Sequence, residues 1–324
     1  MRIDVHNHAI PETALDLVGR EDVYGVRVQG DRWSGGGHAD FTILPSFTDP
    51  AAKLAELDSK RLDGAVISAA PPLFLYDVEP EAGEALARET NQGLAAFCRY
   101  DPRRLRWMAH VPLQSPERDI VILGEAANMG CVGVEIGTSI AGRRLDEPEF
   151  ERFWQTVESE RLPVLLHPAY NEPSNGLQPY YFQNVIGNML ETTIAAERLI
   201  CARVLDRHPQ LQIVLVHSGG YFAYQAGRLR HARAVRPELA EAPEDPWSYL
   251  GQLYFDTITH DREALRYLIS RVGAERVLMG TDLPFDMATP EPMTALEEAV
   301  DGDTARRIAE ENPGQLYRFE SEGD

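Results

Sequence analysis

Short apolar runs recur along the chain, and segments with helical spacing of apolar residues separate them. In the first run, Ile3 and Val5 alternate with polar residues, which predicts a strand at the N-terminus. Seven further runs also predict strands, namely Gly64–Ser68, Arg106–Val111, Gly133–Ile136, Pro163–His167, Leu211–His217, Gln252–Asp256 and Arg276–Gly280. Alternating strands and helices favour a parallel α/β sheet, and eight such units favour a closed (β/α)8 barrel of the TIM type.

Helical patterns fill most gaps between the predicted strands, namely Glu81–Phe97, Glu117–Met129, Pro148–Glu160, Glu191–Arg207, Glu263–Val272 and Thr304–Glu311. A doubly wound open sheet is the rival architecture. It usually carries a GxGxxG turn after a strand, and the sequence contains no such turn. The pattern therefore favours the barrel.

The stretch 21–47 interrupts the alternation. Glycines cluster in it, and valines and phenylalanines are scattered among polar residues, which predicts a small β-rich insertion after the first strand. Asp49 and Pro50 then start a helix, with Asp49 as the expected N-cap. We therefore expect one barrel domain spanning residues 1–324, with an insertion at about 21–47.

Composition narrows the class of partner. Of the 324 residues 44% are hydrophobic and 25% are charged, and the formal net charge of −20 argues against nucleic acid or an anionic membrane as partner. The three cysteines, Cys98, Cys131 and Cys201, are far apart and lie in apolar stretches, which predicts free thiols in a reducing compartment. No signal peptide is evident, and no apolar run approaches about 20 residues. We expect a cytoplasmic protein that binds a small molecule.

Polar side chains that can bind a metal end several of the predicted strands. His6 and His8 follow the first strand, and in extended chain their side chains point to the same side. His167, His217 and Asp282 end strands five, six and eight. A single histidine at a strand end is more often structural. Five such groups at the catalytic end of one barrel predict a metal site.

Seven segments together resemble the amidohydrolase superfamily, and within it the metal-dependent decarboxylases similar to aminocarboxymuconate semialdehyde decarboxylase. The segments are Asp4–His8, His110–Gln114, Gly133–Gly137, Leu166–Pro168, Glu191–Thr193, His217–Gly220 and Gly280–Phe285. The resemblance covers almost the whole chain. It is more specific for this branch than for any one substrate.

The resemblance implies that His6, His8, His167 and Asp282 bind one divalent metal ion per chain. Zinc is the preferred ion, and manganese or another divalent ion is the alternative. A water would complete the site, with His217 as the acid/base beside it and Asp282 sharing in catalysis. A divalent metal lowers the pKa of bound water toward about 7, where an imidazole can exchange that proton.

Strand four bears on the number of metal ions. Many binuclear amidohydrolases bridge two metals with a carboxylated lysine at the end of this strand, which here reads Val134-Glu135-Ile136-Gly137. The only lysines, Lys53 and Lys60, follow the insertion, so a lysine bridge is excluded. A bridge through Glu135 is the alternative to the single metal ion that we expect.

The resemblance also suggests substrate contacts. Arg228 matches an arginine that in the family reaches a substrate carboxylate across a dimer interface, which predicts a homodimer. A solvated helix face is the alternative, because Arg230, Arg233 and Arg236 lie nearby. Phe74, Tyr76 and Phe285 are predicted to line the pocket, with core packing as the alternative for each.

One departure affects the substrate. The namesake decarboxylase has an arginine shortly before its Asp-Pro pair, where this chain reads Thr42-Ile43-Leu44-Pro45; Arg27 or Arg32 could take its place. We therefore expect a metal-dependent, non-oxidative decarboxylase of an unsaturated or aromatic acid, less highly charged than the namesake's substrate. The alternatives are a hydrolase or hydratase of a lactone, amide or alkene in the same site, or a binding protein with a relict site.

Overall fold

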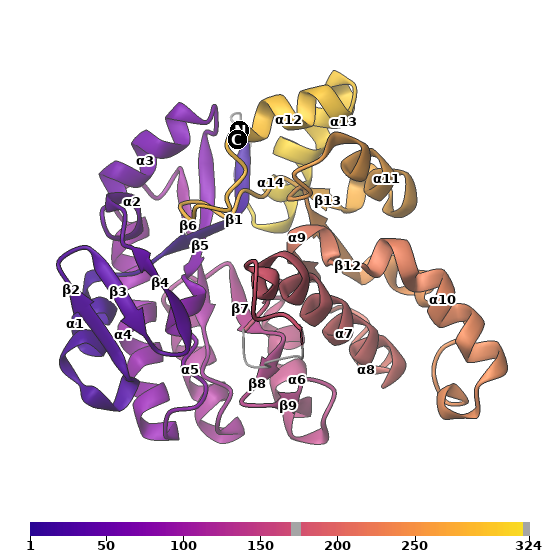
Figure 1. Ribbon diagram of the computed structural model, residues 1–324, viewed down its shortest axis with the longest axis horizontal. Helices are drawn as coiled ribbons and strands as arrows, with labels where there is room; N and C mark the ends of the chain where they lie inside the picture. The colour runs from indigo at the N-terminus through magenta and orange to yellow at the C-terminus, as the bar shows by residue number, and fades with distance from the viewer. Residues whose placement is uncertain (170–175, 320–324) are drawn as a thin grey trace.

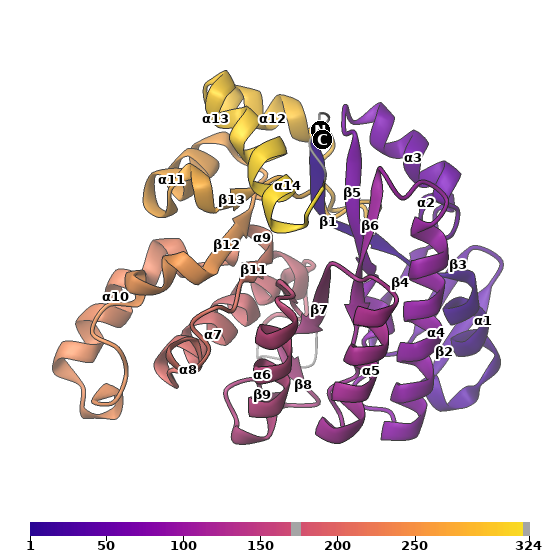
Figure 2. The same ribbon diagram turned by 180° about the vertical axis from the view of Figure 1, so that it is seen from behind.

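Eight parallel strands form the centre of the computed structural model, which describes residues 1–169 and 176–319. Their order in the sheet is their order in the chain: β1 (Ile3–Ala9), β5 (Gly64–Ala69), β6 (Leu105–His110), β7 (Gly133–Gly137), β10 (Val164–His167), β11 (Ile213–Leu215), β12 (Leu253–Asp256) and β13 (Val277–Leu278). Helices surround these strands on the outside (Figures 1 and 2).

The chain just beyond the last strand lies beside β1 and nearly closes the ring. The Val5 N–H donates to the Met279 carbonyl at 2.9 Å, and the His8 N–H donates to the Leu283 carbonyl at 2.8 Å. Asn7 and Leu283 also form an isolated parallel bridge. The predicted barrel is confirmed, with a nearly closed wall of eight parallel strands.

The main helices of the outer layer are α1 (Glu12–Arg20), α3 (Pro50–Ser59), α4 (Pro80–Cys98), α5 (Pro116–Asn128), α6 (Glu151–Glu160), α7 (Asn188–Cys201), α10 (Phe222–Val235), α11 (Arg262–Val272) and α12 (Pro292–Ala299). Asp49 caps α3, because its carboxylate accepts the Ala51 N–H at 2.8 Å. The helix predicted over Glu191–Arg207 is broken into α7 and α8 (Val204–Arg207), where Arg203 has a left-handed φ of 57°. In both views α10 projects away from the barrel.

The insertion holds a small antiparallel sheet of β2 (Val26–Gln29), β3 (Arg32–Gly35) and β4 (His38–Thr42). Trp33 is fully buried and stacks on Phe41, with ring centroids 5.8 Å apart. Phe41 in turn contacts Phe285, beyond the last barrel strand, at 5.9 Å. The insertion therefore packs over the end of the barrel where the strands finish.

The opposite end of the barrel is filled with apolar side chains. This inner cluster comprises Ile3, Val5, Val66, Met108, Leu165, Val214, Val216, Leu278, Tyr317 and Phe319. Tyr317 and Phe319 follow α14 (Asn312–Leu316), so the chain's last described helix closes the bottom of the ring. Within the described residues, no helix is long and apolar enough to cross a membrane.

Candidate metal centre

Four side chains predicted as metal ligands meet at one point. They are His6 and His8 of β1, His167 at the end of β10, and Asp282 beyond β13, and one ligand atom from each lies within 4.8 Å of the others. All four residues are buried. Asp282 Oδ1 is 3.1 Å from His8 Nε2 and 3.4 Å from His6 Nε2.

The three imidazole rings are arranged around this point. Their centroids are 5.0 to 5.3 Å apart, and each pair of rings is nearly perpendicular, at 82° to 87°. Such packing directs one edge of each ring toward a shared centre. The arrangement is the one expected for three ligands on one ion.

The other ring nitrogens are engaged behind the site. His6 Nδ1 donates to Asp256 Oδ2 at 2.8 Å, and His167 Nδ1 donates to the Pro168 carbonyl at 2.8 Å. Metal-binding histidines commonly donate their second nitrogen in this way. His6 Nε2 is buried without a hydrogen-bond partner, which is costly unless a ligand meets it. The residues present therefore fit a divalent cation.

Charge at the site also favours a cation. Burial alone would lower the pKa of His6, but its hydrogen bond to Asp256 and the charge of Asp282 raise that pKa to about 9. Burial opposes ionisation of Asp282, yet its interactions with His217 and His8 hold its pKa well below the usual range. The carboxylates thus attract positive charge to this point, and a metal ion could take the place of the proton on His6.

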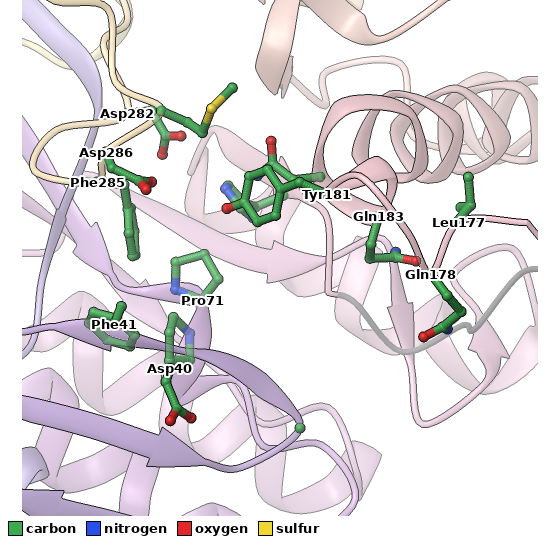
Figure 3. A pocket seen from close by; sticks show the side chains of 15 residues that line it. Asp40, Phe41, Pro71, Leu177, Gln178, Tyr181, Gln183, Asp282, Phe285 and Asp286 are labelled. Carbon is green, nitrogen blue, oxygen red and sulfur yellow. The ribbon is translucent and has the colours of Figure 1, made fainter.

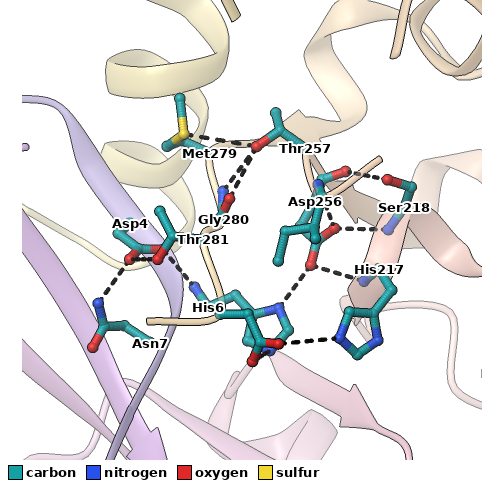
Figure 4. Close-up of polar contacts among 12 residues, drawn as sticks. Asp4, His6, Asn7, His217, Ser218, Asp256, Thr257, Met279, Gly280 and Thr281 are labelled. Atoms are coloured by element: carbon teal, nitrogen blue, oxygen red, sulfur yellow. Dashed lines mark hydrogen bonds and ion pairs between the residues drawn. The ribbon is translucent and has the colours of Figure 1, made fainter. Parts of the chain in front are cut away.

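His217 lies beside the four candidate ligands. It sits in the tight turn α9 (Val216–Gly219), where His217 and Ser218 both adopt left-handed conformations with φ of 51° and 60°. Both N–H groups point to Asp256, and they donate to its carboxylate at 2.9 and 2.7 Å (Figure 4). His217 Nε2 is 3.8 Å from Asp282 Oδ2. This position beside the candidate ligands suits an acid/base.

Asp256 is a site residue that the sequence analysis missed. Its carboxylate accepts hydrogen bonds from the His6 ring and from the main chain of His217 and Ser218. It therefore fixes one candidate ligand and the candidate acid/base together. The signal was available, because Asp256 ends a predicted strand and so stands at the catalytic end of the barrel.

Glu135 lies on the far side of His8. Its Oε1 is 3.8 Å from His8 Nδ1, whereas the shared centre faces Nε2 of that ring. Neither carboxylate oxygen has a hydrogen-bond partner among the described residues, and burial raises the pKa of Glu135 well above its usual value. This geometry disfavours the alternative in which Glu135 bridges two metals.

A cavity of about 470 Å³ opens onto His167 and Asp282 (Figure 3). Its walls include the aromatic residues Phe41, Tyr181 and Phe285, the carboxylates Asp40, Asp282 and Asp286, and the amides Gln178, Gln183 and Asn184. Among the described residues, no lysine or arginine lines it. Phe285 lines this cavity, and its ring contacts the His8 ring, with centroids 5.4 Å apart.

Other predicted substrate contacts lie off this wall. Phe74 and Tyr76 are buried and stacked at 5.4 Å, and Phe74 meets the His167 ring edge-on at 6.1 Å. The Tyr76 oxygen accepts the Gly137 N–H at 2.9 Å. Phe74 packs against His167 and Tyr76 packs against Phe74, and neither residue lines the cavity beside His167.

The candidate arginines are also outside the cavity. Arg228 is exposed on α10, and Arg27 and Arg32 are exposed on β2 and β3. A second cavity, of about 360 Å³, is lined by His217 and His260 and shares Asn184, Asp282 and Met287 with the first. None of the three arginines lines either cavity as far as the described chain extends.

The chain is similar in sequence and in fold to known proteins. The amidohydrolase family model matches residues 3–319. A 2-amino-3-carboxymuconate-6-semialdehyde decarboxylase of Dictyostelium discoideum is 28% identical, covering 92% of this chain and 85% of that protein. A gamma-resorcylate decarboxylase of a Rhizobium species is 27% identical over 96% of this chain and 93% of that protein. The crystal structure of Metarhizium anisopliae IDCase superposes with a TM-score of 0.88 at 26% identity, covering 100% of this chain and 98% of that one.

Proposed function

The chain belongs to the amidohydrolase family and is a metal-dependent carboxy-lyase, and we propose that it removes CO2, without oxidation, from an unsaturated or aromatic carboxylic acid. One observation carries this proposal. Four candidate ligand atoms lie within 4.8 Å of one another, with His217 directly beside them.

We assign one divalent metal ion per chain to His6, His8, His167 and Asp282, with zinc preferred and manganese as the alternative. When bound, the ion would supply positive charge that holds the substrate and stabilises negative charge as the carbon–carboxylate bond breaks. Glu135 faces the other edge of His8, which supports a single ion.

His217 and Asp282 are the catalytic residues in this proposal. Loss of CO2 leaves an electron pair on a carbon atom, and His217 Nε2 would deliver the proton that this carbon takes up. Asp256 accepts one hydrogen bond from the His217 N–H and one from the Ser218 N–H, which holds this turn so that the imidazole stays directed at the site. Asp282 Oδ2, 3.8 Å from His217 Nε2, stabilises the protonated ring before transfer.

The cavity favours a substrate with a single carboxylate. Its wall offers Phe41 and Phe285 to an unsaturated or aromatic ring, and among the described residues it has no lysine or arginine for a second anionic group. A buried carboxylate without such a partner costs several kcal/mol. We therefore propose an aromatic or cyclic monocarboxylate that packs on Phe285. Phe74 would act indirectly, by packing against His167, and Tyr76 by stacking on Phe74.

We also propose that the enzyme is a homodimer and that Arg228 reaches the partner's substrate. Arg228 is exposed on α10, the helix that projects from the barrel, and it is outside both cavities of its own chain. Tyr224, on the same helix, is 82% exposed. The cavity beside His217 would give a partner's side chain a route to the site.

The cytoplasm is the proposed location. Cys98, Cys131 and Cys201 are free thiols, as expected in a reducing compartment. Burial raises the pKa of the Cys131 thiol to about 12, so it is unreactive at neutral pH.

The test begins with purified protein loaded with zinc or with manganese. Elemental analysis should give about one ion per chain, and a panel of aromatic and unsaturated monocarboxylates should include one that releases CO2. The metal-loaded His217→Asn variant is the control for CO2 that is released without enzymatic catalysis. Water consumption without CO2 release would favour the hydrolase or hydratase alternative, and two tightly held ions would refute the single-ion site.

A further inference from the structure

Lys53 is charged yet completely buried. It is one of only two lysines in the chain, and it lies on α3. Its side chain has 0% exposure, whereas Lys60, which follows the same helix, is 24% exposed. Burying an ammonium group costs several kcal/mol unless its hydrogens are matched by partners. The partners of Lys53 therefore indicate why a charge is kept there.

Two of these partners belong to the strand that carries candidate metal ligands. Lys53 Nζ donates to Asn7 Oδ1 at 2.7 Å and to the His8 carbonyl at 3.1 Å. A third contact, at 3.4 Å, is with Glu56 on the same helix. Asn7 stands between His6 and His8, so Lys53 fixes the backbone of β1 where both imidazoles emerge.

The network continues from Asn7 to the last barrel strand. Asn7 Nδ2 donates to Asp4 Oδ2 at 2.8 Å, and the Thr281 hydroxyl donates to the same oxygen at 2.5 Å (Figure 4). The His6 N–H donates to Asp4 Oδ1 at 3.1 Å. Thr281 directly precedes Asp282, the fourth candidate ligand. Like Lys53, Asp4, Asn7 and Thr281 have 0% exposure.

We propose that Lys53 is a positioning residue for the metal centre, and that it acts through Asn7, Asp4 and Thr281 to hold His6, His8 and Asp282 at ligand spacing. The inference rests on the ligand set proposed above. Lys53 and Asp4 also offset each other's buried charge across Asn7. Removing the ammonium leaves the Asn7 oxygen and the His8 carbonyl without this donor, so both ends of the ligand set can shift.

The decisive experiment measures metal affinity, because a purely structural role would lower stability and leave affinity unchanged. Metal-free protein, prepared with a chelator, is titrated with Zn²⁺ by competition and with Mn²⁺ by electron paramagnetic resonance. We expect Lys53→Met to weaken both affinities by about 10- to 100-fold, the range seen when groups supporting metal ligands are lost. Lys53→Met should also broaden the Mn²⁺ resonance signal. Lys53→Arg should restore part of the lost affinity and bring the width of that signal closer to that of the natural chain.

Two further variants complete the test. Lys60→Met removes the other lysine and should leave metal affinity within about two-fold. Thr281→Val removes the hydroxyl that donates to Asp4 with little change of shape, and it should weaken metal binding even if Lys53→Met does not fold. Natural affinity in Thr281→Val, or in a folded Lys53→Met, would overturn the inference and leave the metal centre standing. Failure of the natural chain to bind either Zn²⁺ or Mn²⁺ would overturn both the role of Lys53 and the proposed metal centre.

Discussion

His167 and His217 occupy neighbouring positions, with ring centroids 5.3 Å apart, but only His167 has an atom within the ligand group. We expect His167→Asn to lose the bound metal. His217→Asn should keep the metal and lose about 10²-fold or more in kcat, because it removes the proton donor alone. Elemental analysis and steady-state kinetics on both purified variants measure these outcomes.

The assignment of His217 depends on separating these two effects. If His217→Asn lost its metal, and its activity rose and fell with the residual metal content, His217 would be a ligand. Folding is checked in each variant by circular dichroism, because His217 lies in a strained left-handed turn.

Asp286 offers a way to change substrate charge preference. It lines the cavity four residues after Asp282, has no hydrogen bond or ion pair with another described residue, and has its carboxylate turned toward the Tyr181 side (Figure 3). Burial and the charges of Asp286 and Asp282 raise the pKa of Tyr181. Asp286→Arg should therefore shift kcat/KM toward dicarboxylates over monocarboxylates by about ten-fold, or about 1.4 kcal/mol.

A matched variant separates a local effect of Asp286 from a change in net charge. Asp303→Arg makes the same change at a side chain that is 97% exposed and outside the cavity. It should leave the ratio of kcat/KM values for the two substrate classes unchanged. An equal shift in both variants would assign the effect to long-range charge and remove Asp286 from substrate selection.

At the scale of elements, apolar pattern located every barrel strand but not every strand end. The run Leu211–His217 was predicted as strand, whereas β11 ends at Leu215. Val216 continues the apolar pattern because it packs in the inner cluster, and the turn after it carries His217. Apolar residues indicate burial and not strand conformation, so a buried turn after a strand is predicted as a continuation of that strand.

The candidate ligands were predictable because a parallel barrel brings its strand ends together, so distance along the chain did not matter. The cavity wall was not predictable in the same way. Phe74 and Phe285 both follow a predicted barrel strand, but only Phe285 lines the cavity. The path of the loop after each strand determines where the ring points, and the sequence pattern does not give that path. The contacts of Lys53 could not be predicted from the sequence either, since they are single hydrogen bonds that join α3 to β1.

The contact between α7 and α10 gives a pH-dependent prediction. Gln225 donates to Glu197, and burial raises the pKa of Glu197 to about 7 despite this hydrogen bond. The folded state then binds a proton that the unfolded state releases near pH 4.3, so Glu197 lowers stability as pH rises from about 4.5 to 7. Glu197→Gln should gain on the order of 1 kcal/mol at pH 8, discounted for partial exposure, and little at pH 4.5.

Urea unfolding at several pH values checks this expectation. The difference in unfolding free energy between Glu197→Gln and the natural chain should grow with pH and level off above about pH 7. A difference that stays constant from pH 4.5 to 8 would show that Glu197 does not take up the proton. Glu263→Gln, on an exposed face of α11, is the control.

At the scale of the whole molecule, the position of Arg228 predicts that two chains share each active site. Mixing inactive His217→Asn chains with inactive Arg228→Ala chains should restore up to about a quarter of natural activity in a random mixture, because half the dimers are mixed and each has one intact site. Activity is measured after chain exchange, with mixed dimers isolated on two different tags. Confirmed mixed dimers without activity would place Arg228 in its own chain's site or outside it.

The barrel wall and the candidate metal centre both bring the first barrel strand together with the segment after the last one. His8 and Asp282 are 274 residues apart in sequence and 3.1 Å apart in space. A bound ion would act as a reversible cross-link across that long loop, and it would stabilise only the folded state. Removing the metal with a chelator should therefore lower Tm by several degrees, measured by calorimetry, and added metal should restore it. A Tm independent of metal would refute this coupling.

The same feature bears on how the protein is made. β1 is synthesised before the other barrel strands, but one of its sides pairs with the chain just beyond β13, the last of the described barrel strands. Until that segment is synthesised, the backbone groups and imidazoles at one edge of β1 lack their partners. Contacts of such high sequence separation form slowly, so the candidate metal site is completed only after β13 has been synthesised. We therefore expect a metal ion to bind in the final stage of folding, once the segment after β13 has joined β1.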